Sequence, residues 1–333
     1  MIVLAQGDDM KFSQNLRQTQ YRTIYELFDK TPRIHIVQVQ EVLGVSRDTA
    51  SKRVKEAIEQ GYIVGPHIRK RSFLNFEEIV YIVKCEDPIA LCRKLSKNKH
   101  VIYHELLDGF ADVRIITTKE IDIDGEIMLK GVRSDYFISF APLRTWIAAI
   151  NIIQKMIQDF DPAQYVPQGL IETHWDESVV WDEQDEILYK EFKYGLRKPL
   201  EPLVKKKYKM WSGKAYEWLE RLSECCTVYT CYFPESIDNY DSYIFMFETD
   251  YTDFIVELFS QLPTTVWFFT VADKLFVYLW VERGSMKNVN FRKPKINNLQ
   301  IPLIVRDLLK KGIIKSKAHA AIQYFWRKGI DDR

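Results

Sequence analysis

The sequence predicts an α+β protein of two tandem halves, each a winged helix-turn-helix followed by a ferredoxin-like module. Three observations support this prediction: a helix–turn–helix pattern near the start of the chain, runs of β-forming residues after it, and an apolar pattern that returns about 165 residues later. The segments that we expect are a winged helix-turn-helix DNA-binding domain (14–75), a ferredoxin-like domain (76–141), a helix with an acidic linker (142–180), a degenerate second winged helix (181–235), a second ferredoxin-like domain (236–285) and basic C-terminal helices (286–333).

The first helix-turn-helix is the clearest motif of the chain. Gly44 lies where the first of its helices must stop, since a residue without a Cβ can take the positive φ of a helix C′ position. Ser46 follows at an N-cap position, and Ala50 and Val54 form an apolar face on the next helix. A helix that is apolar behind and cationic in front is suited to reading the major groove. The residues that we expect on the DNA-facing side are Arg47, Thr49, Ser51, Lys52, Arg53 and Lys55.

A basic segment follows the second helix. Gly65 and Pro66 predict a turn, and Arg69, Lys70 and Arg71 come soon after it. We expect these three cations to form a wing that contacts DNA phosphates without reading bases. The alternative is an ordinary helical hairpin whose charged face is only solvated.

The second half repeats the apolar pattern but not the charges. Val39 aligns with Val204 and Ala50 with Ala215, and this register continues along the helices and strands. The second would-be reading helix, 212–224, contains glutamates that phosphate would repel. We therefore expect the second copy to serve as a structural partner, with the lysines near its start either touching DNA phosphate or pointing to solvent.

Each half continues with β-rich sequence. In the first half, strands expected at 101–107 and 111–117 meet at Asp108-Gly109, a hairpin signal, and the residues before them read as a strand and a helix. This order is that of a ferredoxin-like unit with a shortened second helix. The corresponding strands of the second half are rich in aromatic side chains, which need a cover. We therefore expect 76–141 to pack against 236–285 within one chain.

Composition limits the possible functions. At 333 residues and 47% apolar, the chain can form several domains, and a net charge of +1 confines any DNA-binding charge to local patches. No apolar run approaches the roughly 18 residues of a membrane span. Five cysteines without a CxxC spacing fit reduced thiols, and hence a cytoplasmic protein. The basic stretch 284–328, with helices expected at 301–309 and 318–326, either adds a DNA-backbone contact or is a solvated cap.

Signatures of enzymes are sparse. His100 and His104 have the spacing of a helical zinc pair, but they fall on a loop that enters a strand. Cys225, Cys226 and Cys231 read as small apolar residues. No Walker loop, GxGxxG or GxSxG motif occurs. We therefore expect no enzymatic activity, no metal and no cofactor.

The first half resembles the Lrp/AsnC (feast/famine) transcriptional regulators. The resemblance rests on Gly44-Val45-Ser46 with Thr49 to Val54 after it, on Leu74-Asn75 and on Gly109 to Asp112. It covers about residues 14–141, and only its pattern recurs later in the chain. The resemblance implies a DNA-binding regulator whose second, RAM-type module dimerises through its sheet and binds small effectors, often amino acids. The sequence departs from the family at Gln40, where a small residue is usual.

The function that we expect is sequence-specific DNA binding by a transcriptional regulator, with double-stranded DNA as partner and a homodimer or higher homo-oligomer as the assembly. An amino-acid effector is expected at Gly109, which permits close backbone approach, and at Asp112, whose carboxylate suits an amino group. Two alternatives remain open: a protein-interaction module without DNA contact, and a decarboxylase of haem biosynthesis, an activity of some relatives with this architecture. The His/Arg pocket motif of those relatives is not found in this sequence.

Overall fold

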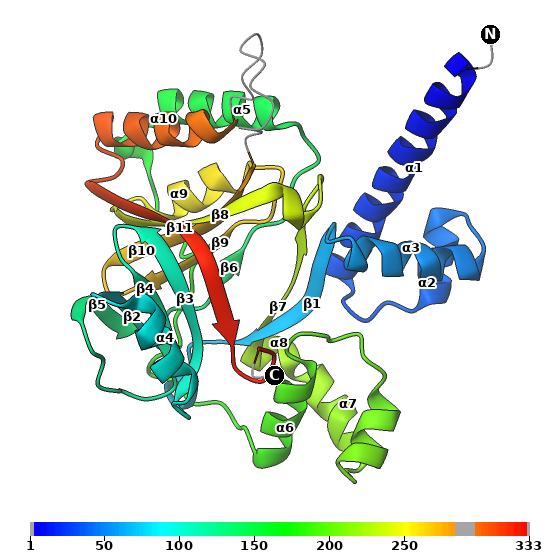
Figure 1. Ribbon diagram of the computed structural model, residues 1–333, viewed down its shortest axis with the longest axis horizontal. Coiled ribbons are helices and arrows are strands. Elements are labelled where there is room, and N and C mark those ends of the chain that lie inside the picture. The colour runs from blue at the N-terminus through cyan, green and yellow to red at the C-terminus, as the bar shows by residue number, and fades with distance from the viewer. Residues whose placement is uncertain (1–2, 284–296, 332–333) are drawn as a thin grey trace. The chain divides into compact units, whose positions relative to one another are not determined.

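The computed structural model describes residues 3–283 and 297–331, which form two compact units (Figure 1). Unit 1 consists of Met1–Arg69 and Trp181–Asn239, and unit 2 of Lys70–Val180 and Tyr240–Arg333. Each unit therefore combines segments from both halves of the sequence. In the part of the chain that the structure describes, no helix is both long enough and apolar enough to cross a bilayer.

The first part of unit 1 has the predicted helix–turn–helix. Its elements are α1 (Val3–Lys30), α2 (Ile36–Leu43), α3 (Arg47–Glu59) and β1 (Ile63–Lys70). Gly44 ends α2 with a φ of 63°, and the Ser46 Oγ caps α3 by accepting from the Thr49 amide at 3.2 Å. Both the stop and the cap are as the sequence predicts. Ala50 and Ala57 are fully buried on the inner face of α3.

The second part of unit 1 has a similar order of elements. These are α6 (Glu183–Phe192), the π-helical turn η3 (Pro202–Lys207), α7 (Ser212–Glu220), the short α8 (Leu222–Cys225), β7 (Cys226–Tyr232) and the 3-10 turn η4 (Ile237–Asn239). Strand β7 pairs with β1 in a two-stranded sheet. Val204 and Ala215 are buried, as are Val39 and Ala50, with which the sequence aligns them.

Two arginines link the loops before α2 and before η3, and we call this arrangement the arginine clasp. Each guanidinium donates hydrogen bonds to backbone carbonyls of the other loop, 163 to 165 residues away in the sequence. The acceptors are the carbonyls of Leu196 and Lys198 for Arg33, and those of Pro32 and Ile34 for Arg197. The clasp is therefore reciprocal, since each arginine lies between the acceptors of the other.

Unit 2 is built on one nine-stranded sheet, in the order β5-β2-β4-β3-β11-β8-β10-β9-β6. Its first set of elements is η1 (Leu74–Phe76), β2 (Ile79–Lys84), α4 (Pro88–Ser96), β3 (Val101–Gly109), β4 (Val113–Thr117), β5 (Glu126–Val132), β6 (Phe137–Ile138), α5 (Trp146–Asp159) and η2 (Pro162–Gln164). Its second set is β8 (Tyr240–Glu248), α9 (Thr252–Phe259), β9 (Trp267–Val271), β10 (Lys274–Glu282), α10 (Asn297–Lys310) and β11 (Ser316–Arg327). The second set has the β-α-β-β-α-β order of a ferredoxin-like module.

The sheet of unit 2 closes on itself. Strands β5 and β6 stand at its two edges, yet they are consecutive in the chain: β5 pairs with β2 and β6 with β9. Between them, Arg133 forms a bridge to Val271. Inward-facing residues of both modules share one core, which includes Val80, Ile82, Ile116, Ile244, Phe269 and Phe276. The two modules thus meet within one chain, as predicted, but they are also joined edge to edge through β3 and β11, which was not predicted.

The C-terminal segment corrects one prediction. A helix is present at 297–310, but 318–326 belongs to a strand, β11, and not to a helix. Alanine favours helices in isolation, yet pairing with both β3 and β8 outweighs that preference and buries Ala320 completely. The second sheet module therefore continues past 285 to Arg327. Four cations of the basic stretch 284–328, Lys287, Arg292, Lys293 and Lys295, lie outside the described residues.

Candidate nucleic-acid interface

The exposed side of α3 carries the candidate DNA-reading residues. Arg47 and Ser51 are exposed, and Arg47 forms no ion pair with any described residue. Lys52 and Lys55 are 71% and 72% exposed, and their ion pairs with glutamates one turn on are long, at 3.9 and 3.7 Å. Exposed pairs of this kind are weak, so both ammonium groups are available to another anion. We call Arg47, Ser51, Lys52 and Lys55 the α3 cationic face.

Arg53 does not belong to this face. Its side chain is 17% exposed, its Nε donates to Gln20 of α1 at 2.8 Å, and its Nη1 donates to Glu56 at 2.5 Å. The reason is helical spacing: Arg53 follows Ala50 by three residues and precedes Ala57 by four, and both alanines are buried. The expectation that Arg53 points away from the core is therefore wrong.

Thr49 is also occupied within the helix. Its Oγ1 lies 2.9 Å from the Ser46 Oγ, and its amide donates to the same hydroxyl. Because these two hydroxyls close the first turn of α3, Thr49 serves the N-cap in this structure.

The basic wing differs from the prediction. Residues 63–70 form one continuous strand, β1, without the turn expected after Pro66. The Arg69 guanidinium lies 4.8 Å from the Tyr194 ring centre, and the Lys70 ammonium lies 4.4 Å from that of Phe76. Arg71 pairs with Glu172 at 3.0 Å. All three cations thus have contacts inside their own unit, and the predicted turn is wrong. Their contact with DNA phosphate stays a prediction.

The predicted effector residues have structural contacts as well. A Cβ on Gly109 would lie 2.4 Å from the His319 carbonyl oxygen, because β11 runs directly beside it. The Asp112 carboxylate accepts from the Cys85 amide at 2.9 Å. The space directly beside Gly109 is therefore filled by β11, and Asp112 is engaged by a backbone amide.

Several cations of the segment from α6 to α7 are paired with carboxylates. The Lys214 ammonium of α7 lies 2.7 Å from Asp182 and 2.8 Å from Asp185. In η3, Lys205 pairs with Glu201 at 2.9 Å and Lys207 with the partly buried Glu191 at 2.6 Å. Three of its cations are therefore tied to carboxylates at short distance, unlike those of the α3 cationic face.

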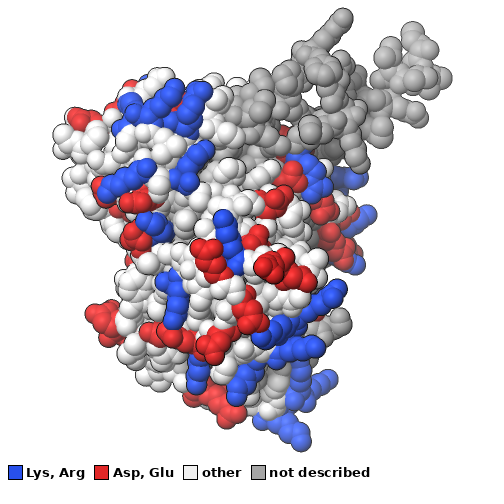
Figure 2. Space-filling view, turned by 60° about the vertical axis from the view of Figure 1, so that its left-hand side comes forward, with Lys and Arg blue, Asp and Glu red and all other residues white. Residues whose placement is uncertain are grey.

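Charge on the rest of the surface has no single sign. Figure 2 shows acidic and basic side chains interspersed over much of the face that it presents, with basic side chains gathered near its lower right. This agrees with a net charge of +1 for the whole chain. Any attraction of DNA must accordingly come from local groups.

The interior of unit 2 holds a buried ion pair that sequence reasoning missed. The Arg114 Nε on β4 lies 2.6 Å from the Glu105 Oε1 on β3, and the Tyr103 hydroxyl donates to the same carboxylate at 2.5 Å. Burial alone would lower the pKa of Arg114, but the Glu105 charge outweighs it and holds the pKa above its ordinary value. A signal was present in the sequence, since each charge stands within a largely apolar run that is expected to form a strand.

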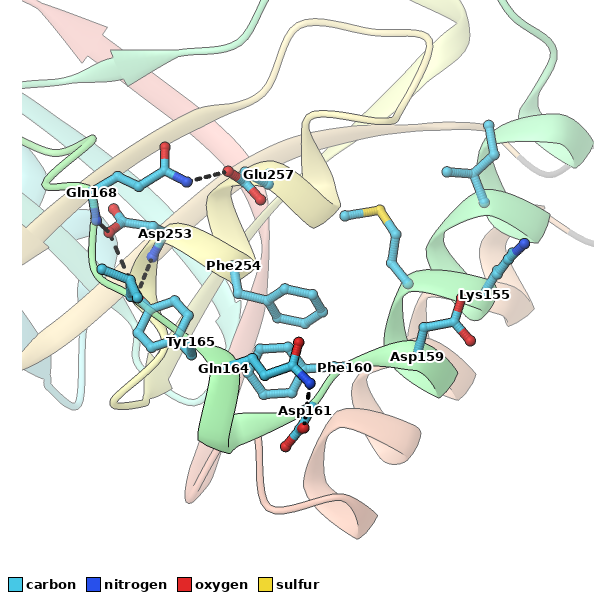
Figure 3. Close-up of a pocket in the computed structure, with 13 residues that line it drawn as sticks. Lys155, Asp159, Phe160, Asp161, Gln164, Tyr165, Gln168, Asp253, Phe254 and Glu257 are labelled. Carbon is cyan, nitrogen blue, oxygen red and sulfur yellow. Dashed lines mark hydrogen bonds between the residues drawn. The ribbon is translucent and has the colours of Figure 1, made fainter.

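A pocket of about 600 Å³ lies beside α5 and α9, and Figure 3 shows its lining. Its most buried polar group is the Asp253 carboxylate, which accepts from three successive amides, those of Gln168, Gly169 and Leu170, at 2.6 to 3.1 Å. The Glu257 carboxylate accepts from the Gln168 side chain at 3.2 Å. These carboxylates therefore hold a loop in place.

One group of side chains has donor atoms close enough for a metal ion. Asp135, Glu172 and His174 bring an oxygen or nitrogen within 4.8 Å of one another. However, the Arg71 Nη1 lies 3.0 Å from Glu172 and 3.4 Å from the His174 Nε2. The guanidinium already supplies the positive charge that a cation would bring.

The comparisons with known proteins bear on both units. The winged helix-turn-helix DNA-binding family matches residues 19–64, which span the end of α1, α2, α3 and the start of β1. No curated protein matches the chain. Among solved structures, the siroheme decarboxylase NirDL is similar, with 11% identity, a TM-score of 0.44 and coverage of 93% of this chain and 92% of that chain. The same enzyme in complex with an iron-uroporphyrin III analogue has 11% identity, a TM-score of 0.41 and coverage of 94% and 92%.

The likeness to a decarboxylase contradicts the expectation of a protein without enzymatic activity. The solved chains that it resembles are named as an enzyme, so the lack of known catalytic motifs did not justify that expectation. At this identity and TM-score the likeness assigns no activity to the present chain.

Proposed function

We propose that the protein is a sequence-specific DNA-binding transcriptional regulator that acts in the cytoplasm and reads the major groove with α3. The observation that carries the proposal is the α3 cationic face, on a helix that Ser46 caps directly after the glycine turn that ends α2, within the segment that the winged helix-turn-helix DNA-binding family matches. A helix fixed at both its turn and its core can present its outer side chains to base edges.

The residues have different roles in this proposal. Arg47 lies in the first turn of α3, where recognition helices contact bases, and its planar guanidinium suits guanine. Lys52 and Lys55 supply charge to the phosphates on either side of the groove, and Ser51 offers a hydroxyl between them. Arg53 positions α3 against α1 and does not touch DNA.

We further propose that the chain is a tandem duplication of the Lrp/AsnC type with one DNA-reading helix. Support comes from the arginine clasp, whose reciprocal partners stand 163 to 165 residues apart, and from buried positions that recur at the same interval. At that interval Lys52 and Lys55 correspond to Glu217 and Glu220 of α7. A palindromic site would then require two chains, with half-sites spaced by whole turns of DNA.

Fluorescence anisotropy with DNA from the region upstream of the protein's own gene tests the proposal. We expect the combined Arg47→Ala, Lys52→Ala and Lys55→Ala substitutions to abolish specific binding. The slope of log affinity against log salt should fall by about 0.9 for each phosphate that the protein no longer neutralises.

The matched control removes three cations from a different helix region. Arg93, Lys94 and Lys97 are exposed on or beside α4, and replacing all three by alanine changes the net charge by the same amount. We expect this control to bind DNA as the wild type does. Equal affinity of wild type and the α3 variant, both folded by circular dichroism, would contradict the proposal.

A further inference from the structure

The arginine clasp carries two positive charges without a carboxylate partner among the described residues, although the Arg197 guanidinium lies 4.1 Å from the centre of the Phe28 ring. Within the described residues, neither Arg33 nor Arg197 forms an ion pair with a carboxylate; both donate to carbonyls, which carry no net charge. A guanidinium has five N–H donors, so donors remain unused on both side chains. Both guanidiniums can therefore still pair with an anion and donate further hydrogen bonds to it.

The electrostatics of the clasp are unfavourable as they stand. Burial lowers the pKa of Arg33, and burial together with the neighbouring Arg33 charge lowers the pKa of Arg197 to about 10. Both shifts have the sign expected for half-buried cations without a counter-ion. An anion between or beside the two guanidiniums would reverse this repulsion.

The clasp borders a pocket that has room for such an anion. The pocket has a volume of about 680 Å³ and is lined by both arginines, by His35 and Ile36 at the start of α2, and by Tyr216 and Leu219 of α7. Its volume is within the range of small-molecule sites. Glu201 also lines it, but its carboxylate pairs with Lys205.

The start of α2 adds to the positive potential of the pocket. The first turn of α2 contains no acidic residue, so the positive end of the helix dipole is not neutralised there. The His35 and Gln38 amides are engaged at the cap of α2, by the Gln38 side chain and the His35 carbonyl. A helix N-terminus and arginine forks together are a common arrangement for oxyanions, phosphate above all.

We propose that the pocket beside the arginine clasp binds a phosphate group, which Arg33 and Arg197 hold between the two helix-turn-helix segments. The phosphate is carried either by a small molecule or by the backbone of DNA, and the experiment below distinguishes these sources. The proposal does not depend on DNA reading by α3, because free phosphate can be titrated without DNA.

Calorimetric titration of the full-length protein with inorganic phosphate, against chloride at equal ionic strength, tests the proposal. We expect phosphate to bind and chloride not to bind. Leu219→Glu should weaken phosphate binding by about tenfold or more, because it places a carboxylate in the pocket while leaving the clasp in place. Arg197→Lys, which keeps the charge but loses the forked geometry, should have an intermediate effect.

The control for Leu219→Glu is Leu143→Glu, the same change at a side chain that is 80% exposed and belongs to unit 2. It should bind phosphate as the wild type does. The proposal is overturned if phosphate does not bind to the wild type, or if Leu219→Glu binds it with unchanged affinity.

The source of the phosphate is decided with the same variants and DNA. If the group belongs to the DNA backbone, Leu219→Glu should reduce the slope of log affinity against log salt by about 0.9, and inorganic phosphate should compete with DNA. If it belongs to a small molecule, DNA binding by Leu219→Glu should equal that of the wild type. Loss of DNA binding in the α3 variant tests only the function of α3. It does not change the result expected for the phosphate titration.

Discussion

At the residue scale, helical spacing decides which cations of α3 are free. Arg47 and Arg53 are both arginines of one short helix, yet one is exposed and the other lies among buried alanines and donates to Gln20 and Glu56. Spacing from Ala57 separates them in the sequence: both arginines stand three residues from Ala50, but Arg53 is four residues from Ala57, on the same face, and Arg47 is ten residues from it. The contacts with Gln20 could not have been predicted, because they depend on how α1 crosses α3.

This difference predicts opposite outcomes for two arginine variants. Arg53→Ala should lower the free energy of unfolding by about 1–3 kcal/mol, since it removes charged hydrogen bonds, and should leave specific DNA affinity nearly unchanged. Arg47→Ala should leave stability unchanged and weaken DNA binding by about 1–3 kcal/mol. Urea denaturation and anisotropy measure the two quantities. A reversal of this pattern would show that the roles are assigned the wrong way round.

A second residue-scale prediction concerns acid stability. His104 is 1% exposed, its Nε2 lies 2.9 Å from the Ser96 Oγ, and burial lowers its pKa from 6.5 to about 4. As the pH falls, the imidazole of His104 is protonated in the unfolded chain before it is protonated in the folded protein. The free energy of unfolding is therefore retained above pH 6.5 and falls between pH 6.5 and 4, by up to about 3 kcal/mol.

His104→Gln, which stays neutral, should remove this contribution. The measurement is urea denaturation at pH 7.5 and pH 5. Glu191 adds little to the pH dependence of the free energy of unfolding in this range. Burial would raise its pKa, but hydrogen bonds from Lys207, Tyr208 and Lys198 outweigh burial and lower the pKa from 4.5 to about 2. Its contribution to stability is therefore lost only at lower pH. A pH dependence as steep in His104→Gln as in the wild type would contradict the assignment.

At the element scale, helix ends and strands that depend on nearby residues were predicted correctly from the sequence. Pairings between strands that are distant in the sequence were not. The stop at Gly44, the cap at Ser46 and the strands around Asp108-Gly109 follow from nearby residues. The strand β11 does not, because its state is fixed by β3 and β8, more than 200 and about 70 residues away in the sequence. The same limit explains the site: Gly109 was expected to face a ligand, and it faces β11.

The buried pair of β3 and β4 supplies the element-scale prediction. Arg114→Leu should destabilise unit 2 by about 3–5 kcal/mol, because Glu105 would keep a charge without its partner. Adding Glu105→Leu should recover part of that loss, since neither charge then remains. A double variant whose loss equals the sum of the single losses in urea denaturation would show that the two groups do not act as a pair.

At the scale of the whole molecule, the two halves of the sequence differ in charge but share a pattern of buried positions. Buried positions recur along both helix-turn-helix segments, and the arginine clasp joins them reciprocally. The cations of α3 are mostly exposed, whereas Lys214 of α7 is held by two aspartates. This difference supports our proposal that one helix of the two, α3, reads DNA.

A charge exchange between these helices tests that assignment most directly. One variant has Lys52→Glu and Lys55→Glu in α3; a second adds Glu217→Lys and Glu220→Lys in α7, which restores the wild-type net charge. We predict that anisotropy with the specific DNA site shows no specific binding for either variant, because the position of the cations matters and not their number. Specific binding by the first variant, or its recovery in the second, would contradict the central claim that α3 is the reading helix.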